Sequence, residues 1–455
     1  MDILLVNPPY FTPDEMSSRS KEYGHWIKGG NMYIHPFEPP LGLGSLCAYL
    51  REKKFDVKLI DMVGLMMEEK EMEKLLLEKR PSIVGITTMT PTLPSVQRIA
   101  RLTKQVLPTA KVILGGVHPT VNPEGCLEDK NIDFIVRGEG EMPLEAVLSG
   151  RLKDKLKDIP GLCYKNGSVK TRNMAPLIED LNSLPLADYA SFPVERYVQY
   201  NKNLRGLRGI SMLVSRGCPY FCSFCAVHQT MGRRFRVKSP ERVVSEMEYL
   251  KEKYSLEGIW FKDSIFNLDK KWVFAFCSEI KKRGLKISWQ YNTRVDLVDE
   301  EELIIEKEAG LVQLDLGIES GSPKSLKTLA KGIDVDKIQG IVQMVKRHAK
   351  VAGFFMIGIP GEALEDIEMT FDLAKKLRLD KYTWSLFSPL PGSALYNDLR
   401  NQPAFTAQIK ELETAHFTEN PFSFCKVSGD KLRKIYGQIN EYFSQEAGNL
   451  QKQEG

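Results

Sequence analysis

The sequence predicts an α/β protein with two parallel sheets, one after the other along the chain. In residues 1–145 and again in residues 209–388, short apolar stretches alternate with amphipathic stretches of helical period. Strands that are separated by helices pair in parallel, and the helices cover the sheet. The 455 residues, 42% of them hydrophobic, are enough for two or three packed domains.

The first region, residues 1–145, is typical of an open sheet. We expect strands over residues 3–6, 57–61, 83–88, 112–114 and 132–136, and helices over residues 41–53 and 95–106. Ligands of such sheets lie beyond the carboxyl ends of the strands. Small residues, which let a ligand approach the backbone, gather there at Pro8, Pro9, Thr87, Thr88, Thr90, Gly115, Gly116, Gly138 and Gly140. Turns need the same residue types, so this pattern leaves both interpretations open.

The second region predicts six strand–helix units in succession. A linker over residues 146–205, with one hairpin near Asn166-Gly167, leads into it. The strands are expected over residues 210–214, 258–262, 286–291, 312–317, 351–357 and 382–387. The first helix has a clear start, with Ser239 as its N-cap and Pro240 in its first position. Six units indicate a partial, open barrel over residues 206–395, with its chemistry at the carboxyl ends of the strands. Residues 396–455 are expected to form a helical C-terminal region.

Composition and charge argue against several classes of function. The net charge is +4 and the basic residues are interspersed with acidic ones, so the sequence shows no footprint for nucleic acid. No apolar run approaches the roughly 20 residues that span a bilayer. Residues 1–9 have no basic leader and no small-residue cleavage site. We therefore expect a cytoplasmic protein with no transmembrane segment.

Three of the eight cysteines crowd into one loop, whereas the other five stand apart. Cys218, Cys222 and Cys225 follow the first predicted barrel strand with the spacing C-x₃-C-x₂-C. In a reducing compartment such a group favours a metal site over disulfides. Three thiolates fit a [4Fe-4S] cluster that keeps one iron open. The competing metal is zinc, which needs four ligands in a structural site, with His228 as the candidate for the fourth.

This cysteine motif resembles that of the radical S-adenosylmethionine (SAM) superfamily, and the resemblance covers most of residues 205–395. Segments after later predicted strands match as well, among them Leu316-Gly317-Ile318-Glu319 and Gly358-Ile359-Pro360-Gly361. One departure is Ser264, which stands where a second aspartate is common. The resemblance implies a set of SAM-binding residues in addition to the cluster cysteines. These are Phe224, Asp263, Arg294, Glu319, Gly358 and Ile359.

Residues 1–145 resemble the flavodoxin-like, Rossmann-type cobalamin-binding domain of the B12-dependent radical SAM enzymes. The order of the matching segments and their spacing ahead of the cysteine motif imply a cobalamin site. The resemblance places it at Asn7, Pro8, Thr88, Thr90, Gly115, Gly116, His118, Gly138 and Glu139. The signature Asp-x-His-x-x-Gly, which supplies an axial histidine in other B12 domains, is absent. Neither His25 nor His118 has an aspartate two positions earlier, so we expect no histidine nitrogen on cobalt.

The resemblance implies a cobalamin-dependent radical SAM C-methyltransferase. In that scheme a 5′-deoxyadenosyl radical takes hydrogen from an unactivated carbon of a small-molecule substrate, which then receives a methyl group from methylcobalamin. The cofactors carry this chemistry, so no catalytic acid–base pair is expected in the protein. An electron donor such as flavodoxin or ferredoxin is the expected partner.

Three alternatives stay open. One is a B12-dependent enzyme that does not methylate, resembling the anaerobic magnesium-protoporphyrin monomethyl ester cyclase. The second is a sensor without turnover, and the third is a radical SAM enzyme whose first domain no longer binds B12. The aromatic residues Trp384, Phe387 and Tyr396 either line the mouth of the barrel or belong to its core.

Overall fold

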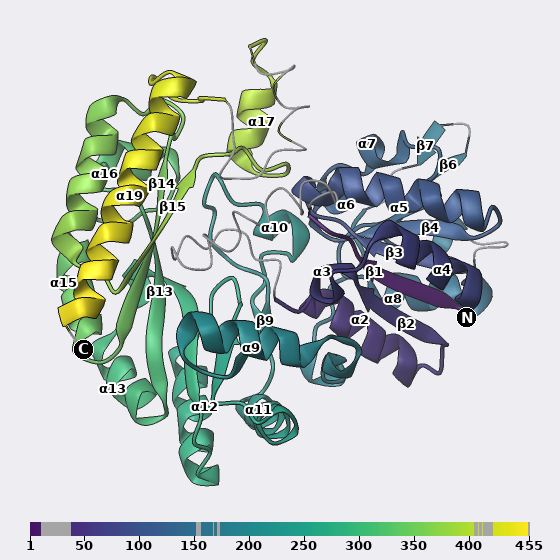
Figure 1. Ribbon diagram of the computed structural model, residues 1–455, viewed down its shortest axis with the longest axis horizontal. Coiled ribbons are helices and arrows are strands. Elements are labelled where there is room, and N and C mark those ends of the chain that lie inside the picture. Colours follow the sequence, from purple (N-terminus) through teal and green to yellow (C-terminus); the bar gives the residue numbers. More distant parts are fainter. Residues whose placement is uncertain are drawn as a thin grey trace.

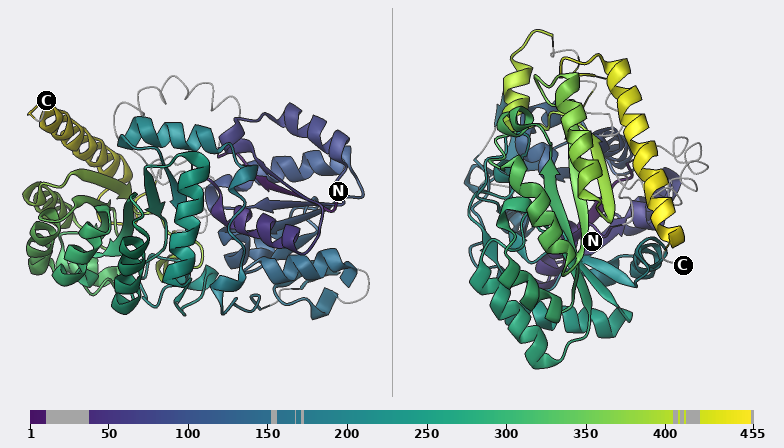
Figure 2. Two further views of the ribbon diagram at one scale, coloured as in Figure 1. Left: turned by 90° about the horizontal axis from the view of Figure 1, so that it is seen from below. Right: turned by 90° about the vertical axis from the view of Figure 1, so that its left-hand side faces the viewer.

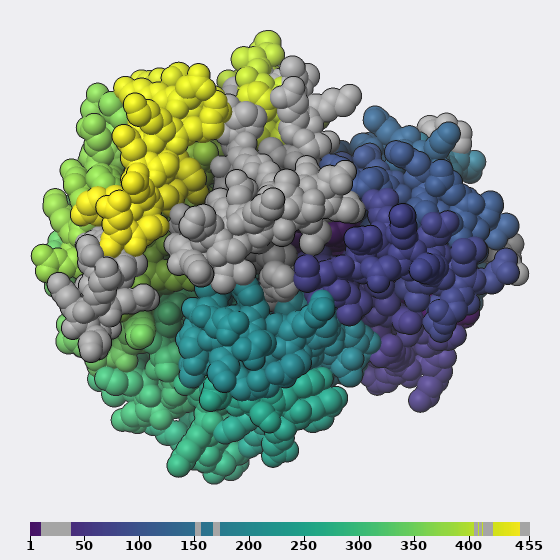
Figure 3. Space-filling view, in the orientation of Figure 1, coloured from purple at the N-terminus to yellow at the C-terminus, as the bar shows by residue number. Residues whose placement is uncertain are grey.

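The computed structural model consists of two α/β bodies that lie side by side (Figure 1). It describes residues 1–10, 38–151, 156–166, 168–170, 173–404, 408, 412 and 422–453. The N-terminal body holds a seven-stranded sheet, and the C-terminal body holds a six-stranded sheet. In the space-filling view the teal segment that contains α9 (Val194–Arg205) joins the two bodies (Figure 3).

The first sheet has the strand order β2-β1-β3-β4-β5-β6-β7, and its first five members are parallel. These are β1 (Ile3–Asn7), β2 (Val57–Asp61), β3 (Ile83–Thr87), β4 (Lys111–Gly115) and β5 (Phe134–Val136). The main helices beside them are α2 (Leu41–Glu52), α4 (Glu69–Lys79), α5 (Leu93–Val106) and α8 (Glu141–Ala146). The chain reverses direction along the sheet between β1 and β3, and such a point opens a crevice at the carboxyl ends of the strands. The predicted open parallel sheet is confirmed.

A hairpin extends this sheet beyond the predicted end of the first domain at residue 145. The strands β6 (Leu162–Asn166) and β7 (Ser168–Lys170) are antiparallel, and β6 pairs with β5. The hairpin predicted in the linker is therefore present, although Gly167 at its turn lies outside the described residues. Because β6 continues the hydrogen-bonded sheet, we propose that the first domain ends after Lys170.

The second sheet is an all-parallel, open half-barrel with the strand order β15-β14-β13-β12-β11-β8. Its strands are β8 (Gly209–Met212), β11 (Gly258–Phe261), β12 (Ser288–Arg294), β13 (Leu311–Glu319), β14 (Lys350–Ile357) and β15 (Lys381–Leu386). Helices that cover it include α11 (Pro240–Tyr254), α12 (Lys270–Arg283), α13 (Glu300–Glu308), α15 (Val335–Lys346) and α16 (Leu364–Leu377). The six predicted strand–helix units are confirmed, and the Ser239 side chain accepts a hydrogen bond from the Arg242 backbone as an N-cap.

Side chains alternate along the barrel strands. In β13, Leu314, Leu316 and Ile318 are fully buried in the hydrophobic core. Because successive side chains of a strand point to opposite faces, Gly317 lies on the other, inner face. The Glu319 carboxylate, beyond a register shift in the pairing with β14, reaches the same face, with Oε1 2.9 Å from the position of a Cβ at Gly317. Polar groups therefore lie at the carboxyl end of the strand, on the concave face of the half-barrel.

The long helix α19 (Gly429–Gln453) packs against β15 at the edge of the half-barrel (Figure 2). The ring of Phe443 from this helix stacks on Tyr382 at 4.0 Å and on Trp384 at 5.7 Å between ring centroids. Trp384, Phe387 and Tyr396 are all buried, at 3%, 2% and 9% exposure. They belong to the packed interior, which decides between the two interpretations of these aromatic residues. No described helix is long and apolar enough to cross a membrane.

Candidate functional site

The three clustered cysteines lie on a loop that a two-stranded ribbon holds at the end of β8. Strand β9 (Ser215–Arg216) pairs antiparallel with β10 (Arg236–Val237), and the cysteine loop leaves from β9. Gly217 begins the loop with φ +90°, and a Cβ there would lie 2.2 Å from the Arg234 carbonyl oxygen. Only glycine tolerates both this backbone conformation and this close approach. The loop is therefore fixed against the segment that follows it.

Cys218, Cys222 and Cys225 are half-buried. Burial raises the pKa of Cys225 to about 11 and also raises that of Cys218, whereas the nearby Lys331 charge acts in the opposite direction. Iron binds the thiolate, so metal binding has to release these protons. No three His, Cys, Asp or Glu side chains among the described residues are close enough to hold a single metal ion. The three thiols of this loop are as many as a [4Fe-4S] cluster with one open iron requires.

Arg294, predicted to bind SAM, reaches the cysteine loop. Its Nη1 lies 3.4 Å from Cys222 Sγ, and its guanidinium lies over the Tyr220 ring, 4.0 Å from the centroid. It is held by Asp296 at 2.9 Å and by the Lys331 carbonyl oxygen at 2.5 Å. A cation is thus fixed beside a metal-ligand sulfur at the carboxyl end of β12.

Lys331 is a residue of this site that the sequence analysis missed. Its Nζ lies 2.9 Å from Glu319 Oε1, and both side chains are nearly buried, at 6% and 11% exposure. The same ammonium group lies 5.8 Å from the centroid of the Phe224 ring. Glu319 takes a positive φ of +69°, which is uncommon for a residue with a side chain. The pair places one positive and one negative group next to the cysteine loop.

Phe224, Gly358 and Ile359 meet on the apolar side of the site. Ile359 is fully buried in a small hydrophobic cluster, and Phe224 packs against that cluster. The amides of Gly358 and Ile359 donate to Glu362 Oε2 at 2.7 and 3.1 Å. Glu362 thereby holds a tight turn after β14, in which Gly358 has φ +84°. Phe224 and the turn that holds Gly358 and Ile359 therefore lie at the same hydrophobic cluster.

Asp263, predicted to bind SAM, lies two residues after β11 and contacts the strand that leads into the cysteine loop. Its Oδ1 accepts hydrogen bonds from the Ser215 backbone and hydroxyl, at 2.5 and 2.6 Å, and from the Val214 amide at 3.1 Å. Burial raises its pKa to about 6. Oδ2 is buried and has no hydrogen-bond partner among the described residues. One oxygen of Asp263 therefore braces the strand before the cysteine loop, and the other is the one left for a ligand.

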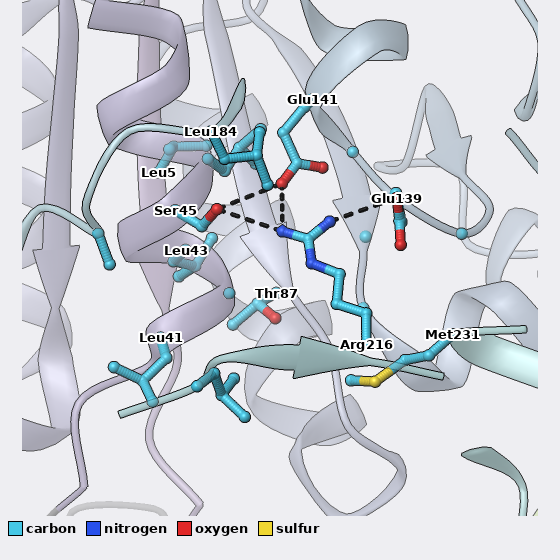
Figure 4. Close-up of a pocket in the computed structure, with 18 of the residues that line it drawn as sticks. Leu5, Leu41, Leu43, Ser45, Thr87, Glu139, Glu141, Leu184, Arg216 and Met231 are labelled. Carbon is cyan, nitrogen blue, oxygen red and sulfur yellow. Dashed lines mark hydrogen bonds and ion pairs between the residues drawn. The ribbon is translucent and has the colours of Figure 1, made fainter. Parts of the chain in front are cut away.

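A cavity of about 260 Å³ opens at the carboxyl ends of the first sheet. Its wall includes Gly115, Gly116, Gly138 and Glu139, and Arg216 reaches into it from the second body. Arg216 lies 2.6 Å from Glu141 and 3.3 Å from Glu139 (Figure 4). Arg236 pairs with Glu139 at 2.7 Å from the adjacent strand. Since Arg216 lies two residues before Cys218, one strand connects the cavity wall to the cysteine loop.

The other predicted cobalamin residues lie around this cavity and not in its wall. Thr88 and His118 are fully buried, and the His118 amide donates to the Thr88 carbonyl at 3.2 Å. His118 Nδ1 lies 3.1 Å from Thr90 Oγ1, and burial lowers the His118 pKa to about 4. Asn7 donates to the buried Asp61 at 2.8 Å. Through these contacts the loops that follow the strands are held in place by Asn7, Thr88, Thr90 and His118.

Two further predicted positions complete this account. Pro8 is buried directly after β1. His25 lies outside the described residues. The predicted absence of an axial histidine on cobalt therefore stays a prediction.

Comparison with known proteins identifies both bodies. The model of the B12 binding domain matches residues 32–148, and the model of the radical SAM superfamily matches residues 212–374. An uncharacterized methyltransferase of Pyrococcus horikoshii is 34% identical over 410 residues, which cover 88% of this chain and 87% of that protein. The chain belongs to the radical SAM enzymes that carry a B12-binding domain. The predicted class of enzyme is confirmed, and the predicted cofactors, a [4Fe-4S] cluster, SAM and cobalamin, are those of this class.

Individual relatives differ in what they do. The anaerobic magnesium-protoporphyrin IX monomethyl ester cyclase of Rubrivivax gelatinosus is 29% identical over 411 residues, 88% of this chain and 70% of that enzyme. The radical SAM methyltransferase TsrM of Kitasatospora setae, solved with cobalamin and a [4Fe-4S] cluster, has a TM-score of 0.70 at 20% identity, covering 88% of this chain and 75% of that one. The cobalamin-dependent radical SAM enzyme OxsB has a TM-score of 0.68 at 20% identity, and the match covers 98% of this chain and 61% of OxsB.

Proposed function

We propose that this enzyme is a cobalamin-dependent radical SAM C-methyltransferase that acts on an unactivated carbon of a small molecule. The observation that carries the proposal is the single strand β9, which links the cavity of the B12-binding body to the cysteine loop of the half-barrel. A methyl group on cobalamin and a radical generated from SAM must meet at one substrate. Such a reaction needs the two sites to be held together, and the ion pairs of Arg216 do this.

The proposed roles follow from position. Cys218, Cys222 and Cys225 hold a [4Fe-4S] cluster, and no fourth cysteine stands in their loop. The open iron is then available to the amino and carboxylate groups of SAM. Phe224 and the turn at Gly358-Ile359, which lie at one hydrophobic cluster, are assigned to the adenine ring. Glu319 is assigned as an acceptor for a ribose hydroxyl and Lys331 as a cation for the methionine carboxylate, because the pair lies beside the cysteine loop.

On the N-terminal side, the cavity lined by Gly115, Gly116, Gly138 and Glu139 takes part of the cobalamin. When bound, the cluster and SAM supply the radical and cobalamin supplies the methyl group. The chain itself binds, orients and excludes water. Arg216, Glu139 and Glu141 hold the two bodies together, and Arg294 keeps a cation beside the cluster loop.

A second candidate is a B12-dependent enzyme that forms a ring or adds oxygen without methylating. It is supported by the similarity to the Rubrivivax cyclase at nearly the same coverage of this chain as the Pyrococcus methyltransferase. The methyltransferase has the higher identity, and TsrM shares the arrangement of both bodies. We therefore place methylation first.

The test is anaerobic turnover with reduced, cobalamin-loaded enzyme, SAM and candidate substrates, followed by mass spectrometry. Methylation predicts a product heavier by one CH₂ together with S-adenosylhomocysteine. A product with added oxygen or a new ring, formed without S-adenosylhomocysteine, would replace this proposal with the second candidate. Chemical reduction with dithionite serves here, so the result does not depend on the electron donor.

A further inference from the structure

The outer face of the cysteine loop carries an aromatic residue that the fold does not bury. Phe221 is 55% exposed although it directly precedes Cys222. The guanidinium of Arg233 lies over its ring, 3.8 Å from the centroid. Arg233 is itself exposed, and so is Gln229 nearby in the sequence. An exposed ring that a cation holds in place, one residue from a cluster ligand, is a feature that packing does not explain.

The basic segment beside Phe221 lies directly on the cysteine loop. The Cys218 amide donates to the Gly232 carbonyl at 3.2 Å. The Arg234 carbonyl lies so close to Gly217 that a Cβ there would approach it to 2.2 Å. Arg233 and Arg234 therefore project from a strip of chain whose backbone directly contacts the backbone of the cysteine loop.

The exposed charge of this strip is positive. Arg234 is 70% exposed and pairs at 2.5 Å with Glu179, whose side chain is 60% exposed. Arg233 contributes a second guanidinium, and among the described residues Glu179 is the carboxylate that pairs with this strip. Burial, and to a smaller extent the charge of Arg233, lowers the pKa of His228, so this histidine is not counted among the cations of the strip. A partner with negative charge would be steered to this face.

We propose that the loop patch, defined as Phe221, Gln229, Arg233 and Arg234, is the docking surface for an acidic one-electron carrier protein. The inference rests on the proposed function, because the cluster is what requires an electron. One electron leaves the reduced carrier and enters the cluster, so the carrier is oxidised by one electron and the cluster is reduced by one. No bond forms or breaks and no proton moves. Phe221 supplies the apolar contact, and the short covalent path from Phe221 to the Cys222 thiolate connects the contact to the cluster.

Transient electron-transfer complexes bury little surface and depend on steering by charge. The loop patch has both properties, a small apolar centre and a cationic rim. A substrate-facing wall is the competing use of the same residues, because α10 (Val227–Thr230), which begins beside the loop, contacts α6 (Val117–Val121) of the other body. The two uses predict different effects of the same substitution.

The experiment measures reduction of the reconstituted cluster by reduced flavodoxin in a stopped-flow instrument, with dithionite as a second reductant. The variant is Arg233→Glu, and Arg233→Lys keeps the charge. The matched control is Lys337→Glu on α15, where an equally drastic change falls on a side chain that is 75% exposed and far from the loop in sequence. Flavodoxin binding to the same proteins is measured by calorimetry. Iron and sulfide are counted first in every protein.

We expect Arg233→Glu to slow reduction by flavodoxin about tenfold at low ionic strength and to weaken flavodoxin binding by a similar factor, since a rim charge acts mainly on the association rate. High salt should bring variant and wild type together because it screens exposed charges. Reduction by dithionite, SAM affinity and the two control proteins should be unchanged.

The proposal is overturned if the variant accepts electrons from flavodoxin as fast as wild type, or if it is slowed equally with dithionite. It is also overturned if the variant alters the KM for substrate, which would make the patch a substrate wall. Should Arg233→Glu not retain its iron, the wild-type enzyme decides, because a rate of reduction by flavodoxin that does not fall with salt contradicts charge steering. A wild-type protein that assembles no cluster would instead refute the proposed function.

Discussion

The pair formed by Lys331 and Glu319 offers a sharp test of the proposed SAM site. Lys331→Met keeps the length of the side chain and removes its charge. Glu319 would then be left as a carboxylate on a side chain that is 11% exposed, without its cation. Removing one partner of a buried ion pair leaves an uncompensated charge, which is strongly unfavourable. The site would lose both its ammonium donor and the fixed orientation of Glu319.

The size of the effect follows from the contacts. A hydrogen bond to a charged group contributes about 1.5–3 kcal/mol. Each 1.4 kcal/mol corresponds to a factor of about ten in affinity. Lys331→Met should therefore raise the Kd for SAM about 10- to 100-fold. Glu319→Gln combined with Lys331→Met should cost less than the sum of the two single changes, since the two side chains act as one pair.

The assay is anaerobic equilibrium dialysis of SAM against reconstituted protein with its iron counted. The matched control is Lys327→Met, which makes the same substitution at an exposed lysine of α14 (Pro323–Thr328). A Kd for the Lys331 variant within about twofold of wild type, at equal iron content, would refute the placement of SAM against this pair. Strictly additive effects in the double variant would refute the coupling.

Three further predictions concern the frame around the site. Gly217→Ala should abolish cluster loading while the circular dichroism spectrum stays unchanged, because the new Cβ meets the Arg234 carbonyl at 2.2 Å; full iron content would contradict this. Arg216→Met should destabilise the protein by about 3 kcal/mol and lower cobalamin retention in gel filtration, because Glu141 keeps only a neutral partner; unchanged melting would contradict it. Asp263 has a pKa that folding raises from 3.8 to about 6. Its contribution to stability is therefore present below pH 4 and is lost as the pH rises to 6. Between pH 4 and pH 6 the free energy of unfolding of Asp263→Asn should therefore rise by about 3 kcal/mol relative to that of wild type. Melting curves at the two pH values measure this difference, and an unchanged difference would contradict the prediction.

The strand pattern could be predicted because both sheets are parallel and covered. Buried strands of this kind are continuous apolar runs, and each run here is separated by a helix with readable ends, as at Ser239. The sequence predicts the hairpin that extends the first sheet as part of the linker. The reason is that the pairing of β6 with the edge strand β5 depends on tertiary contact and leaves no periodic signal in the sequence. Its turn at Asn166 was nevertheless visible in the sequence.

The cysteines and the turn at Gly358 could be predicted because motif and chemistry coincide there. Lys331 could not, since in the sequence it is one lysine in a stretch that also holds the exposed Lys324 and Lys327. Its burial comes from the way the chain turns back after α14 toward Glu319. The bracing role of Asp263 could not be predicted either, because its hydrogen bonds to Ser215 arise only in the folded protein. Its predicted role in binding SAM stays a prediction.

The most direct test of the central claim is spectroscopy of the anaerobically reconstituted protein before and after SAM is added. The account predicts about four irons per chain, a reduced-state electron paramagnetic resonance signal that shifts when SAM binds, and loss of that signal in Cys218→Ala, Cys222→Ala and Cys225→Ala. A protein that loads no such cluster, or a cysteine variant that still releases 5′-deoxyadenosine from SAM, would contradict it.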